Sequence, residues 1–240
     1  MFKHAIFIPQ FNYAYFCALK PTIMAYKAII AGASGLIGSN LVKILLEAPQ
    51  YSEVLVIARK EMPIQHKKLV QLVINFDELD KHAEAINGHA VFSCLGTTKN
   101  QTPDEQQYRK IDHDYPLQLA QLAKQNGVEQ FHVVSSIGAN KNASTFYLKL
   151  KGELEDELQK LGLKTLHIYQ PSMLMGERDR NQWAEKLATG LFKFIDPLLV
   201  GGLKKYRSIK GITVAHAMFK KSLESATGTF IYTSDKIHTI

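Results

Sequence analysis

The feature that most constrains this chain is a glycine-rich loop between a short apolar run and an amphipathic helical pattern. The run YKAIIAG (26–32) ends in glycine, and the pattern SGLIGSNLVKILLEAP (34–49) follows it. A strand, a glycine turn and a helix in this order can bind phosphate, because the backbone approaches the ligand closely and the first helical N–H groups point at it. A plain strand-to-helix turn is the alternative. The residues predicted to contact a cofactor here are Gly32, Ser34, Gly35, Leu36, Ile37 and Gly38.

Apolar runs and helical patterns continue to alternate behind this loop. Strands are predicted at 53–59, 68–76, 89–96, 129–136, 163–169 and 228–233, and helices at 76–88, 103–127, 145–161 and 213–225. Strands that are apolar almost throughout are typical of sheets covered on both faces. We therefore predict an α/β fold of the Rossmann type, a doubly wound and mostly parallel sheet with helices on both faces.

Length and composition suit one globular domain. The 240 residues are 46% hydrophobic and 21% charged, which excludes a disordered chain or a coiled coil. Cys17 and Cys94 are too few for a disulfide framework and fit a reducing compartment, so we expect a cytoplasmic protein. No apolar run approaches the roughly 20 residues of a membrane span. The net charge of +7 does not by itself name a partner.

Two segments depart from the alternating pattern. Residues 1–23 contain two lysines, no acidic residue and no clean period, so we interpret them as an extension outside the domain; a misassigned start site is one hypothesis for it. The single domain is then 24–240. Within it, 171–212 interrupts the alternation, with a helix-like pattern at 183–195, and we expect this segment to cover a substrate.

The residues at the predicted strand ends favour binding of a dinucleotide with a ribose 2′-phosphate. The second strand ends in Arg59 and Lys60, where an NAD site usually has an acidic residue for the ribose 2′-hydroxyl. Two cations would attract a 2′-phosphate, so we predict a preference for NADP(H) over NAD(H). Further cofactor contacts are expected from Asn75, Phe76, Leu95 and Gly96.

A serine, a tyrosine and a lysine follow the fifth predicted strand. That strand ends in Ser135 and Ser136, and Tyr147 and Lys151 share a helix face at i and i+4. These groups suit hydride transfer to a carbonyl: the serine hydroxyl polarises the carbonyl, the tyrosine exchanges the proton, and the ammonium favours tyrosinate. The lysine could also reach cofactor ribose hydroxyls.

Together these stretches resemble the short-chain dehydrogenases/reductases, most closely the atypical branch that contains the Tat-interacting oxidoreductase. The resemblance rests on GASGLIGSNL, CLGTT, FHVVSSIGANK and YLKLKGELE. It implies NADPH binding, with Ser136, Tyr147 and Lys151 as catalytic residues and Ser135 as the reserve serine. Cofactor contacts are implied near Pro171 and Leu174. There Gln170-Pro171-Ser172 departs from the Arg-Pro-Gly that relatives often have.

We therefore predict an NADP(H)-dependent oxidoreductase acting on a small carbonyl or alcohol. The alternatives are an NADPH-binding regulatory or sensor protein with little catalysis, and an NAD(P)-dependent sugar-nucleotide epimerase or dehydratase. The expected partner is a small-molecule substrate, whereas nucleic acid is not expected and the oligomeric state cannot be predicted from the sequence.

Other polar clusters have simpler explanations in the sequence. We predict no metal site, and Asp112-His113-Asp114 is interpreted as a solvated helix start. The acidic residues of 153–157 are interpreted as a solvated helix face, and Cys94 as a packing residue. The basic cluster Lys204, Lys205, Arg207 and Lys210 is either a solvated loop or a site for an anionic partner.

Overall fold

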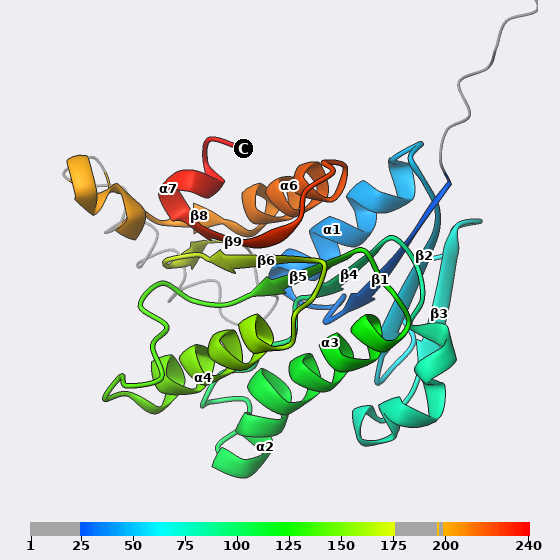
Figure 1. The fold of residues 1–240 in the computed structure, drawn as a ribbon, viewed down its shortest axis with the longest axis horizontal. Helices are drawn as coiled ribbons and strands as arrows, with labels where there is room; N and C mark the ends of the chain where they lie inside the picture. The colour runs from blue at the N-terminus through cyan, green and yellow to red at the C-terminus, as the bar shows by residue number, and fades with distance from the viewer. Residues whose placement is uncertain (1–24, 176–195, 197–198) are drawn as a thin grey trace, which may run out of the picture.

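Seven parallel strands form the central sheet of the computed structural model (Figure 1). Their order is β3-β2-β1-β4-β5-β6-β9, and a separate pair, β7 and β8, lies beyond the main sheet. The main strands are β1 (Tyr26–Ala31), β2 (Tyr51–Ala58), β3 (Leu69–Val73), β4 (Ala90–Ser93), β5 (Gln130–Val134), β6 (Thr165–Gln170) and β9 (Gly228–Thr233). The short pair is β7 (Leu174–Met175) and β8 (Ile209–Lys210). The predicted doubly wound parallel sheet is confirmed.

The structure describes residues 25–175, 196 and 199–240. The extension predicted at 1–23, Cys17 and the helical pattern at 183–195 lie outside these residues. Among the described helices, none has the length and apolar composition needed to cross a membrane.

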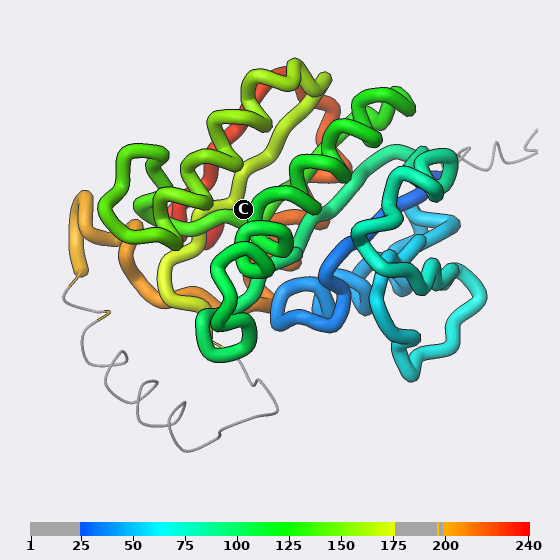
Figure 2. Tube along the Cα trace, turned by 90° about the horizontal axis from the view of Figure 1, so that it is seen from below, coloured from blue at the N-terminus to red at the C-terminus, as the bar shows by residue number. Residues whose placement is uncertain are grey.

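Helices cover the sheet on both faces. One face carries α1 (Leu36–Glu47) and α6 (Gly211–Ser222), and the other carries η2 (Phe76–Ala85), α3 (Tyr115–Gln125) and α4 (Phe146–Lys160) (Figure 1). Figure 2 is turned toward the second face and shows α3 and α4 side by side across the strands. Successive strand residues enter opposite cores: Ile29 packs under α3, and Ile30 under α1. This explains why the strands are apolar at nearly every position.

The long helix predicted at 103–127 is divided in the structure. It consists of α2 (Glu105–Arg109), a π-helical turn η3 (Lys110–Asp114) and α3. The solvated interpretation of Asp112-His113-Asp114 is wrong, because Asp112 and His113 are buried. The helix predicted at 76–88 is a 3₁₀ helix over residues 76–85.

Sheet order defines where a ligand can bind. The chain runs from β1 outward through β2 to β3 and then returns to β4 on the other side of β1. Connections therefore leave the carboxyl ends of β1 and β4 in opposite directions, which leaves a crevice at that edge. The glycine loop follows β1 directly and so lies at this crevice.

Candidate active site

The glycine loop is shaped by close approaches of backbone to backbone. A Cβ atom on Gly32 would lie 2.5 Å from the carbonyl of Cys94, and Gly32 itself has a φ of +85°. A Cβ atom on Gly38 would lie 2.2 Å from the carbonyl oxygen of Gly32. Only glycine fits both positions, so the loop closes tightly against the end of β4. Ser34 and Gly35 are exposed at its tip, whereas Leu36 is half-buried and Ile37 is buried.

The first turn of α1 has free backbone donors. Its N-cap, Gly35, offers no side chain to accept from the first N–H groups, and no acidic residue lies in the first turn. The helix is twelve residues long, so its positive N-terminal end is available to an anion. This fits the pyrophosphate of a dinucleotide, which would contact backbone N–H groups of Leu36, Ile37 and Gly38.

Arg59 and Lys60 are exposed directly after β2. The next turn is fixed to β3 by the Gln71 amide, since Met62 N–H donates to Oε1 at 2.8 Å and Nε2 donates to the Met62 carbonyl at 3.1 Å. The basic pair is therefore held at the edge of the crevice, next to the carboxyl end of β3. No salt bridge within the described ranges occupies either cation.

The residues after β3 and β4 differ in what they can offer a ligand. Asn75 is exposed and caps η2 by accepting from Asp77 N–H at 3.2 Å. The Phe76 side chain is buried against Tyr115, with ring centroids 5.4 Å apart, so only its backbone could reach a cofactor. Leu95 is half-buried and Gly96 is exposed at the end of β4.

Cys94, just before these residues, packs against the core beside α1. Burial raises the pKa of its thiol to about 12, which keeps the thiol protonated. This agrees with the predicted packing role.

Tyr147 and Lys151 lie one helical turn apart near the start of α4. Tyr147 is 38% exposed, whereas Lys151 is buried. The Lys151 Nζ lies 2.9 Å from Asp112 Oδ1, an ion contact without the alignment of a good hydrogen bond. The other oxygen of Asp112 accepts from Thr97 N–H at 2.7 Å. One carboxylate therefore joins the end of β4, the π turn and the lysine of α4.

A second buried carboxylate lies one turn further along α4. Glu155 accepts from the Ser135 hydroxyl and from Gln170 Nε2, whose distances to the two carboxylate oxygens are 3.0 and 2.9 Å. Burial raises the pKa of Glu155, while the two hydrogen bonds and the charge of Lys151 oppose that rise. The solvated interpretation of 153–157 is thus wrong for Glu155 but holds for Asp156, which pairs with Lys160 at the surface.

These contacts separate the two candidate serines. Ser135 is buried and bonded to Glu155. Ser136 is half-buried, and its hydroxyl has one weak contact of 3.4 Å with the Ile137 carbonyl. Ile137 N–H in turn donates to the carbonyl of Pro171 at 3.0 Å, which ties the serine segment to the end of β6. Leu174, in β7, is half-buried beyond Pro171.

The loop after Ser136 is docked onto α4. Asn140 N–H donates to the Leu148 carbonyl at 3.1 Å, and Gly152 lies directly under the Asn140–Lys141 peptide. A Cβ atom at Gly152 would be 2.1 Å from the Asn140 carbonyl carbon. This contact sets how the serine segment sits relative to the helix that carries Tyr147 and Lys151.

Asp112, Glu155 and Gln170 are the polar residues that sequence reasoning missed. For the two acidic residues, the sequence does contain a signal, which is their position relative to the apolar face of the helix. Asp112 falls on the same buried face as Tyr108, Tyr115 and Leu119, and Glu155 falls on the face of Leu154 and Leu158. A charged residue inside an apolar stripe indicates a buried partner.

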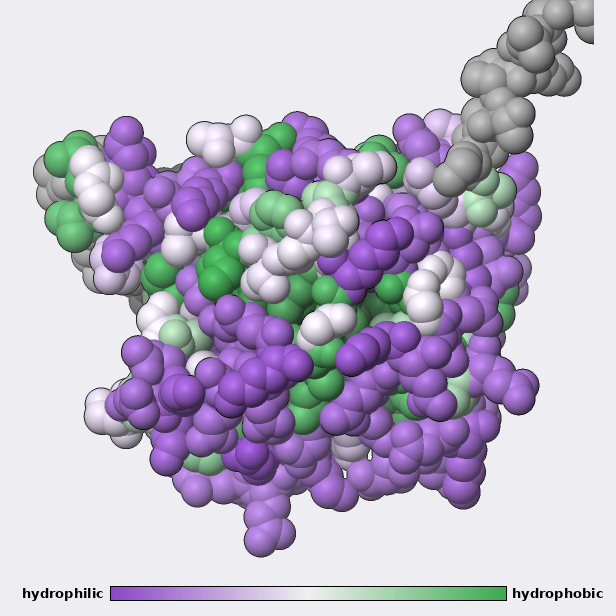
Figure 3. Space-filling model, viewed as in Figure 1, coloured by the Kyte–Doolittle hydropathy of each residue, from purple (hydrophilic) through white to green (hydrophobic). Residues whose placement is uncertain are grey.

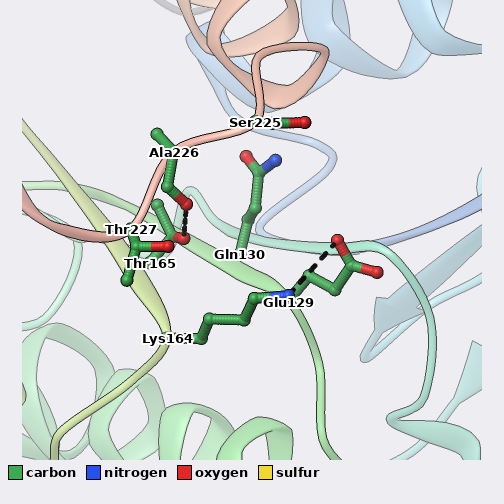
Figure 4. A pocket seen from close by; sticks show the side chains of 7 residues that line it. All are labelled: Glu129, Gln130, Lys164, Thr165, Ser225, Ala226 and Thr227. Carbon is green, nitrogen blue, oxygen red and sulfur yellow. Dashed lines mark hydrogen bonds and ion pairs between the residues drawn. The ribbon is translucent and has the colours of Figure 1, made fainter.

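A second hollow lies at the opposite edge of the sheet, where β5 and β6 begin. Its lining is polar: Glu129, Gln130, Lys164, Thr165, Ser225, Ala226 and Thr227 (Figure 4). Several of these polar groups pair with one another: the Thr165 hydroxyl donates to the Ala226 carbonyl, and Lys164 Nζ lies 4.0 Å from the Glu129 carboxylate. Ligands of open α/β sheets bind at the other edge, so this hollow is not our candidate site.

The fold and the crevice define an NAD(P)-binding Rossmann domain. The family model described as NAD(P)H-binding matches residues 32–186, and the chain belongs to this family. The rat protein HTATIP2 is 32% identical over 203 residues, which cover 83% of this chain and 82% of the relative. Protein FMP52, mitochondrial, of Saccharomyces cerevisiae is 36% identical over 158 residues, which cover 64% and 68%.

Two enzymes are among the solved structures that share this fold. WbmH of Bordetella bronchiseptica in complex with NAD⁺ gives a TM-score of 0.67 at 17% identity, covering 88% of this chain and 77% of that one. UDP-N-acetylglucosamine 4-epimerase of Methanobrevibacter ruminantium gives 0.66 at 16%, covering 87% and 76%. At this identity the likeness concerns the fold.

The comparisons confirm the family resemblance and the coarser functional prediction, an NAD(P)-binding protein of an oxidoreductase-like family. The preference for NADP(H) and the roles of individual residues stay predictions. The cytoplasmic location also stays a prediction, because the yeast relatives are named mitochondrial.

Proposed function

We propose that this protein is an NADP(H)-dependent oxidoreductase that reduces a small carbonyl compound or oxidises the corresponding alcohol. The observation that carries the proposal is the pairing on α4: Tyr147 is exposed toward solvent, and the buried Lys151 lies one turn behind it. The Ser136 hydroxyl follows β5 and has no side-chain partner among the described residues. The bound cofactor would supply the hydride as NADPH in reduction, and would accept it as NADP⁺ in oxidation.

The side chains of this chain would then handle the carbonyl oxygen and its proton. Ser136 donates a hydrogen bond to the oxygen, and Tyr147 gives the proton in reduction or takes it in oxidation. Lys151 has donors left over for the cofactor ribose, since Asp112 occupies one side of its ammonium group. Ser135 serves the fold through Glu155.

The cofactor preference rests on charge at the end of β2. Arg59 and Lys60 are exposed at the place where a ribose 2′-phosphate would arrive. Two cations favour NADP(H) over NAD(H) there. Asn75, Leu95 and Gly96 would line the adenine and ribose side, and Pro171 and Leu174 the nicotinamide side. Residues 171–212 would cover the substrate.

The cofactor assignment is tested by binding. Thermal shifts with NADPH and NADH are compared for the wild type, Arg59→Glu and the control Lys67→Glu, whose lysine is exposed before β3. We expect Arg59→Glu to weaken NADPH binding much more than NADH binding, and Lys67→Glu to change neither. Equal losses for both cofactors would refute the preference.

The reaction is tested by NADPH consumption over a panel of carbonyl compounds. We expect turnover by the wild type and by Tyr206→Phe, and its loss in Tyr147→Phe and Ser136→Ala. Turnover that survives in Tyr147→Phe contradicts the assigned role. Tight NADPH binding without turnover would support the sensor alternative, and a cofactor that stays bound and is recycled would support an epimerase.

A further inference from the structure

The segment before β8 carries an apolar stripe that the proposed reaction does not use. The 3₁₀ helix η5 spans Gly201–Tyr206, with Val200 as its N-cap. Side chains three residues apart stack on one face of a 3₁₀ helix, so Val200, Leu203 and Tyr206 form one row. Their exposed fractions are 62%, 52% and 48%, among the highest of the large apolar side chains described.

Cations flank this row, and Asp196, the one acidic residue in the described part of the segment, is bonded to Ser208. Lys204 is exposed, Lys205 is half-buried, and the Lys205 Nζ lies 5.2 Å from the centre of the Tyr206 ring. None of the salt bridges formed among the described residues involves Lys204, Lys205 or Lys210. The stretch 196–210 contains four cations and one carboxylate, Asp196, which accepts from the Ser208 N–H at 3.1 Å and from the Ser208 hydroxyl.

Contacts with neighbouring elements hold η5, which carries this row, in place. Residues of η5 contact α7 (Ser234–Ile237). Arg207 Nε donates to the Leu199 carbonyl at 2.8 Å, and the Ser172 hydroxyl donates to the Arg207 carbonyl. Arg207 is thereby occupied in holding the turn, while Lys204 is exposed and Lys205 lies beside the Tyr206 ring. Figure 1 shows this element in orange beyond α7, and Figure 3 shows hydrophobic and hydrophilic residues adjoining there at the upper left.

We propose that Val200, Leu203, Lys204, Lys205 and Tyr206, the η5 surface, dock the protein on an anionic phospholipid bilayer. Short apolar side chains beside lysines insert at the level of the headgroups, while the ammonium groups meet the lipid phosphates. A row of three side chains is small for a stable protein interface, which buries more than about 1,000 Å². The row also has only one aromatic ring, Tyr206, on which a nucleic-acid base could stack, because Val200 and Leu203 are aliphatic.

The test is flotation of the full-length protein with vesicles of phosphatidylcholine, with and without phosphatidylserine. We expect the wild type to bind only the anionic vesicles and to be released by salt. Each lysine near such a surface contributes roughly a five-fold gain in affinity, so Lys204→Gln/Lys205→Gln should weaken binding by roughly 25-fold. Leu203→Glu should abolish it.

Matched controls carry the same changes elsewhere. Lys43→Gln/Lys67→Gln removes two exposed lysines from other faces, and Val70→Glu adds an acid on the edge strand β3. Both should float like the wild type, and unfolding midpoints verify that all variants fold.

Wild-type protein that does not float with anionic vesicles would overturn the proposal, as would control variants that lose as much binding as the η5 variants. Salt-sensitive binding to duplex DNA without flotation, or concentration-dependent dimers abolished by Leu203→Glu, would assign the surface to another partner. None of these outcomes depends on whether the protein binds the cofactor.

Discussion

Removing the charge of Asp112 should destabilise the protein far more than removing a surface charge. The Asp112 and Lys151 side chains are 1% and 4% exposed, with 2.9 Å between Oδ1 and Nζ. In Asp112→Asn the single amide oxygen must serve either Thr97 N–H or Lys151, and the NH₂ group then faces another donor. An ammonium left buried without its partner costs about 3–5 kcal/mol.

The structure favours the lower end of that range. Lys151 also interacts electrostatically with Glu155, which remains as a second carboxylate after the substitution. A loss of about 3 kcal/mol corresponds to a fall of roughly 6–12 °C in the unfolding midpoint for a domain of this size. Urea unfolding of the wild type and Asp112→Asn measures it, provided that both unfold in a single transition.

A double variant shows whether Asp112→Asn destabilises the protein through the unpaired buried ammonium or through altered packing. In Asp112→Asn/Lys151→Met the buried ammonium is gone, so the double variant should be more stable than Asp112→Asn alone. The control is Asp156→Asn, whose surface pair with Lys160 should leave the midpoint nearly unchanged. The reasoning fails if Asp112→Asn unfolds like Asp156→Asn, or if Lys151→Met gives no recovery.

Three further predictions concern pH and packing. Burial lowers the pKa of His167 to about 4, so the contribution of His167 to stability should be full above pH 6.5 and fall by about 3 kcal/mol as the pH drops toward 4. His167→Phe should therefore show a shallower fall than the wild type in acid unfolding curves. Burial raises the pKa of Glu155, so the contribution of its protonated form to stability is full below about pH 4.5 and is lost as the pH rises through the raised pKa. The wild type should therefore lose its stability advantage over Glu155→Gln as the pH rises toward neutral. A stability difference that stays constant with pH would contradict this. Gly152→Ala should lower the unfolding midpoint, because the new Cβ atom would collide with the Asn140 backbone. This outweighs the helix propensity of alanine, which is about 1 kcal/mol better than that of glycine. The control is Gly202→Ala, whose Cβ atom would have no neighbouring atom within 4 Å and should not lower the midpoint.

The strands and the phosphate loop could be predicted because their signals are local. Apolar residues at successive strand positions, such as Ile29 and Ile30, require cover on both faces, which only helices on each side of a parallel sheet provide. The glycine-rich sequence predicted a tight strand-to-helix turn, and in the structure other backbone atoms lie close to Gly32 and Gly38. The strand next to β6 could not be predicted, since β9 is 58 residues further along the chain.

The buried carboxylates could not be assigned from residue type alone. Aspartate and glutamate are exposed in most proteins, so the solvated interpretation was the natural one. Their burial arises when the π turn, α4 and the end of β6 meet, which brings together residues 39 positions apart for Asp112 and Lys151 and 15 apart for Glu155 and Gln170.

By itself, the sequence determined the class of fold and the chemical groups available, because periodicity, glycine positions and helix spacing act over a few residues. The family resemblance placed Ser136 before its neighbour Ser135 as the catalytic serine, but no local pattern separates the two. Side chains of adjacent residues in an extended segment point to opposite sides, so only the packing of the sheet decides which one is buried. The tertiary structure directs Ser135 to Glu155 and leaves the Ser136 hydroxyl without a side-chain partner among the described residues.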